Sequence, residues 1–163
     1  MGGRRRHSQS DAPAPPCLTA ISYQPSAISK SRSRADCGPS EDVELGDFRE
    51  LKVWEKAHHL TLVAYKVTAT FPRDELFGLT SQIRRSSASI PANIAEGCGR
   101  NGDAEFARFC GMAMDSANEL DYHLLLARDL NLLKSEDYEL LSSELSETRR
   151  MLAALIQRLK AEG

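Results

Sequence analysis

The feature that most constrains the fold is the spacing of apolar residues after Gly46, where they recur at alternating intervals of four and three in four separate segments. Because an α-helix has about 3.6 residues per turn, this spacing places apolar side chains along one face of a helix. The first segment keeps the rhythm from Val53 to Phe71 and stops before Pro72, which disfavours continuation of a helix. The pattern therefore predicts an all-α domain made of four amphipathic helices.

The second predicted helix runs from about Glu75 to Glu96 and contains Pro91, which removes a backbone hydrogen bond. We expect a kink or a break between Ser87 and Pro91. Gly97 and Gly99 are expected to stop this helix, because glycine readily adopts the irregular dihedral angles of a helix end. The predicted core row comprises Leu76, Leu79, Ile83, Ile90 and Ile94.

The third and fourth helices each follow a capping signal. Asp103 is expected to cap the third helix, whose apolar row runs from Phe106 to Ala127 and contains mostly small residues in its first half. Ser135 is expected to cap the fourth, whose row runs from Leu141 to Leu159. Short connections favour antiparallel neighbours, so the part from Phe48 to Lys160 is predicted to form an antiparallel up-down-up-down four-helix bundle.

Residues 1–46 have a different composition, with most of the prolines of the chain, many serines and arginines, and apolar residues that follow no regular period. Such a segment cannot bury enough apolar surface to fold, so we expect a disordered low-complexity tail followed by the bundle domain at 47–163. Six basic residues and one acidic residue lie in the first 34 positions. The tail is expected to be dispensable, and a basic arm that touches polyanions is the alternative.

Composition argues against several classes of protein. A formal net charge of -2 gives no global signature of a nucleic-acid or membrane partner, and no apolar run is long enough to span a membrane. The four cysteines form no CxxC pair, so we expect free thiols in the cytoplasm rather than a metal site or a disulfide framework. P-loop, GxSxG and paired Cys/His signatures are absent, so neither an enzymatic activity nor a cofactor is expected.

A second row on the flank of the second helix has the same spacing but is polar throughout. Partly buried polar groups need partners, because an unsatisfied one costs on the order of 1–3 kcal/mol. We expect a hydrogen-bond network between the second and third helices that fixes the register of the bundle, with a ligand site as the alternative. The predicted network comprises Gln82, Ser86, Ser89, Asn93, Glu96 and Arg100 together with Ser116, Glu119 and His123.

Three stretches carry a family resemblance: Phe48-Arg49-x-Leu51-x-Val53-Trp54-x-x-Ala57, Phe71-Pro72-x-x-Glu75-x-x-Gly78-Leu79-Thr80-Ser81-Gln82-Ile83-Arg84-Arg85 and Ser89-Ile90-Pro91-x-Asn93-Ile94-Ala95-Glu96-Gly97. They resemble bacterial four-helix bundle proteins encoded in intervening sequences of large-subunit ribosomal RNA genes, over nearly all of residues 48–160. The resemblance implies a homo-oligomer, with a ring-like pentamer favoured. It also implies a distant kinship with accessory proteins of diversity-generating retroelements, which bind nucleic acid and a reverse transcriptase, but it implies no known reaction.

The sequence leaves two main candidate functions. The first is a non-enzymatic homo-oligomeric scaffold that binds RNA or DNA through arginines repeated by symmetry, and the second is a protein–protein interaction module. The middle of the first helix is apolar around most of its circumference, so a partner subunit would cover what its neighbours leave exposed. The alternative role for Arg84 and Arg85 is ion pairing with a neighbouring helix or subunit. The candidate nucleic-acid-binding residues are Arg84, Arg85, Arg100, Arg49 and Lys52.

A ferritin-like di-metal protein is the remote alternative. Glu55-x-x-His58 has the carboxylate–imidazole spacing used in such bundles, and Glu119 with His123 forms a second, wider pair. A site of this kind requires two motifs with the shorter spacing and two further inward glutamates. Because the sequence supplies an incomplete set, no metal is expected.

Overall fold

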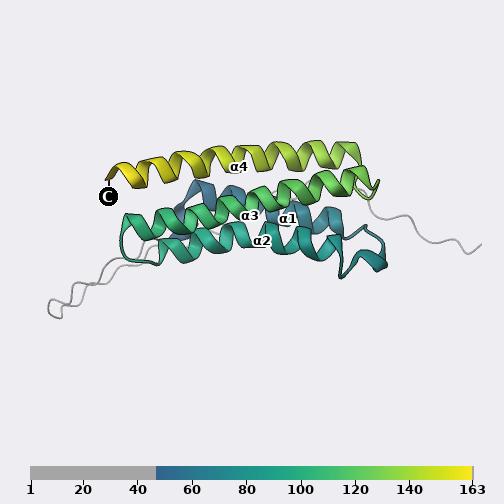
Figure 1. The fold of residues 1–163 in the computed structure, drawn as a ribbon, viewed down its shortest axis with the longest axis horizontal. Coiled ribbons are helices and arrows are strands. Elements are labelled where there is room, and N and C mark those ends of the chain that lie inside the picture. Colours follow the sequence, from purple (N-terminus) through teal and green to yellow (C-terminus); the bar gives the residue numbers. More distant parts are fainter. Residues whose placement is uncertain (1–46, 163) are drawn as a thin grey trace, which may run out of the picture. The chain divides into compact units, whose positions relative to one another are not determined.

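The computed structural model describes residues 47–162, and the predicted disordered tail lies outside the described residues. The described part contains four α-helices, two short 3-10 helices and no strand, which confirms the all-α prediction (Figure 1). No helix in this part is both long and apolar enough to cross a membrane. The elements are η1 (Phe48–Glu50), α1 (Lys52–Thr68), η2 (Arg73–Glu75), α2 (Leu79–Cys98), α3 (Asp103–Asp129) and α4 (Ser135–Glu162).

Contacts between successive helices run in opposite sequence directions, as an antiparallel bundle requires. α4 also returns to α1, where Lys56 contacts Glu144 and Glu147. Each helix packs against two neighbours, so α1 and α3 occupy opposite corners of the bundle (Figure 1). The contacts that define the directions are Thr61–Ser87 and Tyr65–Arg84, then Arg85–Glu119 and Gly97–Phe109, then Asp121–Arg149 and Arg128–Tyr138.

The core is built from the apolar rows that the sequence predicted. Burial of these side chains is the main favourable contribution to folding, because it removes apolar surface from water. Small residues in the first half of the α3 row, among them Cys110 and Ala113, allow α3 to approach its neighbours closely. The largest fully buried apolar side chains are Leu60, Ile83, Ile90, Ile94, Leu120, Leu124, Leu141, Leu145 and Leu152.

α2 begins at Leu79, so the predicted start at about Glu75 is wrong. Glu75 belongs to η2, and its Oε2 accepts a hydrogen bond of 3.0 Å from the backbone N–H of Leu79. The carboxylate thereby satisfies an N–H group in the first turn of α2 and complements the positive end of the helix dipole. Leu76 consequently lies in the connection, 48% exposed, and not in the core row.

The boundary between α2 and α3 also differs from the prediction. Gly97 does not stop α2, which continues through it and reaches its C-cap at Gly99. A Cβ atom at Gly97 would lie only 2.6 Å from the Cβ of Phe109, so this glycine permits a close approach of the two helices. Asp103 is the first residue of α3 and not its cap, because the N-cap is Gly102, whose φ of 91° favours glycine.

Pro91 lies inside α2, which continues past it without a break. Because proline has no N–H group, the carbonyl oxygen of Ser87, four residues earlier, loses its helical donor. The hydroxyl of Thr61 in α1 lies 2.8 Å from that oxygen and donates to it. The same hydroxyl lies 2.9 Å from the carbonyl of Ala57, but that oxygen already has a helical N–H donor. A side chain of α1 therefore replaces the hydrogen bond that Pro91 removes from α2.

Charged residues form ion pairs between α1 and α4. Lys56 Nζ lies 2.9 Å from Glu144 and 2.6 Å from Glu147, and His59 Nδ1 lies 3.4 Å from Glu144. The hydrogen bond between Lys56 and Glu147 is the largest cause of two shifts, because it raises the pKa of Lys56 and lowers the pKa of Glu147. Both groups therefore keep their charges over a wider pH range than they would in isolation.

Candidate nucleic-acid interface

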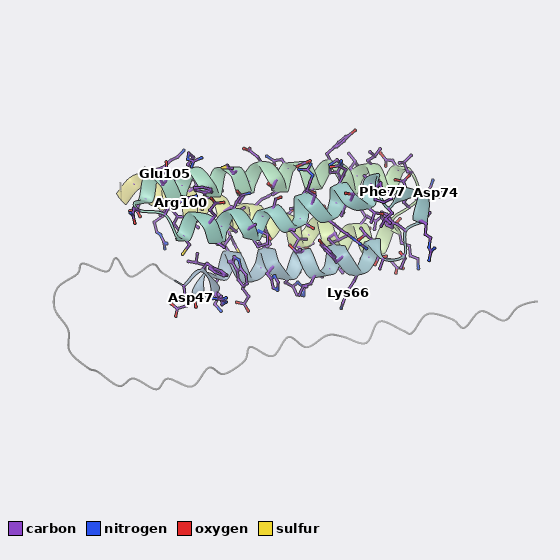
Figure 2. All side chains as sticks on the ribbon, turned by 90° about the horizontal axis from the view of Figure 1, so that it is seen from below. Asp47, Lys66, Asp74, Phe77, Arg100 and Glu105 are labelled. Atoms are coloured by element: carbon purple, nitrogen blue, oxygen red, sulfur yellow. The ribbon has the colours of Figure 1, made fainter. Side chains whose placement is uncertain are left out.

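The five cationic residues predicted to contact nucleic acid lie in two separate places. Arg49, Lys52 and Arg100 lie at the end of the bundle where α1 begins and α2 finishes, and Figure 2 labels Arg100 there. Arg84 and Arg85 lie in the first half of α2, beside the other end of α1. The 17 residues of α1 span about 25 Å at 1.5 Å per residue. The five side chains therefore form no single basic surface on one copy of the chain.

Four of these five cations form ion pairs with carboxylates of the same chain. Exposed pairs of this kind contribute little to stability, but each carboxylate offsets charge that would otherwise attract a phosphate. Arg85 reaches across to α3, which is the ion pairing that the sequence offered as its alternative role. The pairs are Arg49–Asp47, Lys52–Glu55, Arg85–Glu119 and Arg100–Glu96.

Arg84 differs from the other four, because within residues 47–162 it forms no ion pair with a carboxylate. Its Nε donates a hydrogen bond of 2.9 Å to the hydroxyl of Thr68, at the end of α1. That hydroxyl in turn lies 2.8 Å from the carbonyl oxygen of Ala64 and donates to it. The guanidinium carbon lies 5.0 Å from the centre of the Tyr65 ring, within the range of a cation–π contact. The fold therefore positions this guanidinium while leaving its charge uncompensated.

A second arginine cluster, which the sequence did not reveal, surrounds Phe109 where α2 ends and α3 begins. The guanidinium carbon of Arg100 lies 5.3 Å from the centre of the Phe109 ring, and that of Arg108 lies 4.5 Å from it. Arg108 also pairs with Glu105 at 2.9 Å, and this hydrogen bond lowers the pKa of Glu105. Because Phe109 is only 5% exposed, its ring offers no free face on which a base could stack.

The hydroxyls and the amide of the predicted polar network bond mainly within their own helices. Ser86 and Ser89 donate to backbone carbonyls four residues earlier at 2.8 Å, and the amide of Asn93 does the same. Ser116 makes the equivalent bond of 3.0 Å in α3. Local bonds of this kind satisfy a hydroxyl without a partner on another helix. They allow Ser86, a small side chain, to be completely buried.

The polar connection from this row to α3 passes through Arg85. Its guanidinium donates to Gln82 Oε1 at 3.0 Å and also to the carboxylate of Glu119. His123 lies one turn after Glu119, is 14% exposed, and places its Nε2 3.5 Å from Glu119 Oε1. Side chains from α2 and α3 therefore converge on the carboxylate of Glu119. The guanidinium of Arg85 is held in place by its bonds to Gln82 and Glu119.

The residues that suggested a di-metal site have other neighbours. The ring of His58 stacks on Trp54, with centroids 5.0 Å apart and planes inclined by 6°, while Glu55 pairs with Lys52. In the described part of the chain, no three His, Cys, Asp or Glu side chains are placed to hold a metal ion. Cys110 is buried, which raises the pKa of its thiol to about 11 and favours the protonated form at neutral pH.

Several large apolar side chains are exposed on the outside of the bundle. Leu62 and Tyr65 of α1 are each 44% exposed, and Phe77, in the connection from α1 to α2, is 91% exposed (Figure 2). On α3, Tyr122 is 60% exposed. The exposure of Leu62 and Tyr65 agrees with the predicted incomplete coverage of α1. Exposed apolar clusters mark interaction surfaces, because association removes their surface from water.

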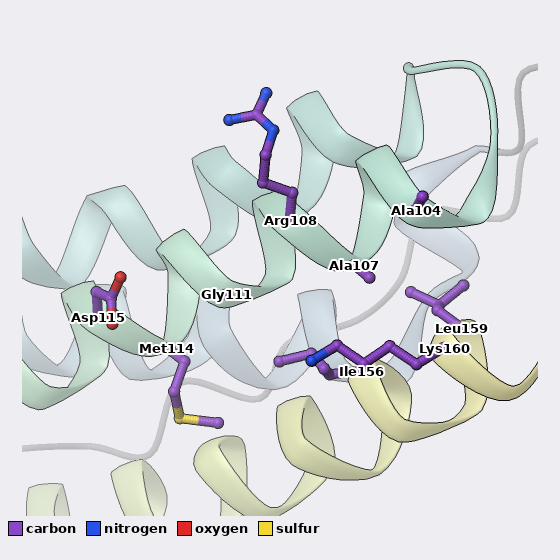
Figure 3. A pocket seen from close by; sticks show the side chains of 9 residues that line it. All are labelled: Ala104, Ala107, Arg108, Gly111, Met114, Asp115, Ile156, Leu159 and Lys160. Atoms are coloured by element: carbon purple, nitrogen blue, oxygen red, sulfur yellow. The ribbon is translucent and has the colours of Figure 1, made fainter. Parts of the chain in front are cut away.

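An open groove of about 630 Å³ lies between the first half of α3 and the last turns of α4 (Figure 3). Its lining is mostly apolar and includes Met114 and Leu159. Gly111 helps to open the groove, since a Cβ atom added there would meet nothing within 4 Å. Asp115 is the only carboxylate among its lining residues, so the groove offers no carboxylate pair for acid–base chemistry.

Known proteins resemble this chain over most of the bundle. A crystal structure of a protein with unknown function from the S23 ribosomal protein family of Bacteroides thetaiotaomicron VPI-5482 shares 26% sequence identity with a TM-score of 0.61, covering 64% of this chain and 95% of that chain. A search of the curated proteins finds no match. Residues 49–154 match the family described as 23S rRNA-intervening sequence protein, a range that takes in α1, α2, α3 and most of α4. The chain therefore belongs to the 23S rRNA-intervening sequence protein family, as the sequence resemblance predicted.

Proposed function

We propose that this protein is a non-enzymatic scaffold that works as a homo-oligomer. The observation that supports the proposal is the exposure of large apolar side chains, led by Phe77, on a bundle that already has a well-formed core. Covering such side chains is favourable, and a second copy of the chain supplies apolar surface of the same kind. The resemblance described above favours a ring of five copies.

Self-association is tested by the mass of the full-length chain in solution. Size-exclusion chromatography with light scattering should give a multiple of the 18.0 kDa monomer mass. The assembly should persist at high salt, because salt screens charges but does not weaken apolar contacts. A mass of 18.0 kDa at every protein concentration would contradict the proposal.

RNA or DNA is the second candidate partner, and the state of Arg84 is the observation that favours it. This guanidinium is oriented by Thr68 and Tyr65 and lacks a carboxylate partner in the described residues. Arginine binds phosphate oxygens through paired N–H groups, and an oligomer would repeat the contact once per copy. Several weak contacts repeated in this way would add to a salt-dependent affinity for a nucleic-acid backbone.

Replacing Arg84 with glutamine should weaken the binding of structured RNA or single-stranded DNA and reduce its salt dependence. The slope of log K against log salt should fall by about 0.7–0.9 for each phosphate group that the variant no longer binds. Titrations at several salt concentrations measure this slope. Arg85→Gln is the matched control, and its effect should be smaller because Glu119 already offsets the charge of Arg85. Equal effects of the two substitutions, or no salt-dependent binding by the unaltered protein, would count against a role for Arg84.

A further inference from the structure

We propose that the nucleic acid bound by this protein is single-stranded, and that its bases stack on a row of aromatic side chains where α1 lies beside α2. This aromatic row consists of Trp54, His58 and Tyr65 of α1, with Phe48 of η1 at one end. The inference rests on the proposed binding of RNA or DNA, and it names the class of nucleic acid and the groups that contact its bases. Arg84 keeps its role as a ligand of phosphate.

The α1 members of the aromatic row lie on the flank of the helix that faces α2. Two contacts mark this flank: the hydroxyl of Thr61 donates to a carbonyl of α2, and the ring of Tyr65 lies against an arginine of α2. Trp54 and His58 precede Thr61 by seven and three residues, and both spacings return to the same face of an α-helix. From Trp54 to Tyr65 the row spans about 16 Å at 1.5 Å per residue.

The planar groups of the row already stack on one another. The rings of Trp54 and His58 are nearly parallel, with centroids 5.0 Å apart and planes inclined by 6°. Phe48 meets Trp54 edge to face, with centroids 4.9 Å apart and planes inclined by 60°. At the other end, the guanidinium carbon of Arg84 lies 5.0 Å from the centre of the Tyr65 ring. A nucleic-acid base is also a flat π-system, so it can join these groups by the same kind of contact.

The aromatic row is accessible to a ligand, unlike the ring of Phe109. Tyr65 is 44% exposed, and the other three members are half-buried. An unpaired base can turn its flat face toward a partly exposed ring. The bases of a duplex present only their edges in the grooves, because their faces are stacked on one another. Stacking on this row therefore selects single-stranded nucleic acid.

The charges beside the row favour a polyanion. The sequence contains no acidic residue in α1 after Glu55, and none in α2 before Glu96. Lys66 follows Tyr65 directly, is exposed, and forms no ion pair within residues 47–162 (Figure 2 labels Lys66). Lys66 and Arg84 are therefore both available to phosphate groups of a strand whose bases lie on the row.

The row also connects the two separate places where the candidate cations lie. Arg49 is at one end, with its guanidinium carbon 4.6 Å from the centre of the Phe48 ring, and Arg84 is at the other. A strand that follows α1 would meet a guanidinium at each end and planar side chains between them. The two places need not form one continuous basic surface for a single strand to contact both.

Tyr65→Leu tests the stacking directly. It should weaken the binding of a single-stranded oligothymidine of about 12 nucleotides by about 5-fold or more, because the ring on which a base stacks is lost. The slope of log K against log salt should not change, since no phosphate ligand is removed. Tyr65→Phe keeps the ring and should bind as the unaltered chain does. Tyr122→Leu, at an exposed tyrosine of α3 outside the row, is the matched control and should have no effect.

Trp54 provides a second measurement that needs no substitution. It is the only tryptophan of the chain, so its fluorescence reports on the aromatic row. Adding oligothymidine should quench this emission with the same midpoint as the binding curve from fluorescence anisotropy, because stacked bases quench an indole ring. An abasic oligomer of the same length carries the phosphates without the bases. It should bind more weakly than oligothymidine and leave the emission unchanged.

The results separate this inference from the broader proposal. If no oligonucleotide binds the unaltered chain with a salt-dependent affinity, the binding of nucleic acid itself is wrong. If the abasic oligomer or a duplex of the same length binds as tightly as oligothymidine, nucleic-acid binding stands and the stacking row is wrong. Equal effects of Tyr65→Leu and Tyr122→Leu, with unchanged circular dichroism spectra, would also overturn the row. So would a Trp54 emission that stays constant up to saturation.

Discussion

Replacing Gly97 with alanine should lower the free energy of unfolding by about 1–2 kcal/mol, although alanine is the better helix former. The added Cβ would lie 2.6 Å from the Cβ of Phe109 and 2.9 Å from Cδ2 of Phe106. The Cβ of Phe109 is fixed to the α3 backbone, so the clash cannot be relieved by rotating a side chain. Overpacking typically costs about 1–3 kcal/mol, which outweighs a gain in helix propensity of about 1 kcal/mol.

Gly111→Ala provides the matched control for this substitution. Gly111 also lies inside a helix, but its added Cβ would meet no atom within 4 Å. Here the helix preference of alanine should act alone and raise the free energy of unfolding by about 0.5–1 kcal/mol. Urea unfolding followed by circular dichroism, at one protein concentration for all variants, measures both changes. If both substitutions changed stability in the same direction, close packing at Gly97 would not be the reason for its glycine.

Thr61→Val should lower the free energy of unfolding by about 1–3 kcal/mol, because it leaves the buried carbonyl of Ser87 without a donor. Valine has nearly the shape of threonine, so packing changes little and the lost hydroxyl dominates the effect. The hydroxyl of Thr61 lies 2.8 Å from this carbonyl, and Pro91 supplies no N–H from its own helix.

A double-mutant cycle with Pro91→Ala tests this explanation. Alanine at position 91 restores an N–H group that can donate to the carbonyl of Ser87, so Thr61→Val should then cost less than it does beside proline. We expect a coupling free energy of about 1 kcal/mol or more between the two positions, measured by urea unfolding of the four proteins. Strictly additive effects would mean that the hydroxyl of Thr61 stabilises the bundle in some other way.

Periodicity alone was sufficient to predict the four helices and most of the core. The rows that contain Leu60 and Leu141 were identified because a helix repeats every 3.6 residues, whatever it packs against. The face that such a row buries depends little on the details of its neighbours. Prediction of this kind therefore succeeds wherever the apolar row is long and uninterrupted.

The errors lie where a tertiary contact overrides a local preference. Glycine commonly ends a helix, yet α2 continues through Gly97, where a side chain is excluded because Phe109 occupies its space. Proline commonly breaks a helix, yet α2 continues through Pro91 with a donor supplied by Thr61. Neither contact can be read from the neighbouring residues, since the partner lies on another helix.

The candidate interface was less predictable than the fold for the same reason. Arg84 and Arg85 are adjacent and chemically identical, but the partner of Arg84 lies 16 residues away and that of Arg85 lies 34 residues away. Their different electrostatic surroundings depend on which side chains the bundle brings near them. Sequence spacing identified both as candidates and could not tell which of them is neutralised.

The hydrogen bond that Thr61 of α1 donates to α2 couples the formation of these two helices. Alone, α2 would lack one helical hydrogen bond at the carbonyl of Ser87, in the middle of its length, and nucleation of a 20-residue helix is already unfavourable. Docking of α1 removes that penalty, so the two segments should become ordered in a single cooperative step. As long as residue 91 is proline, substitutions at position 61 are restricted to side chains that can still donate a hydrogen bond to the carbonyl of Ser87.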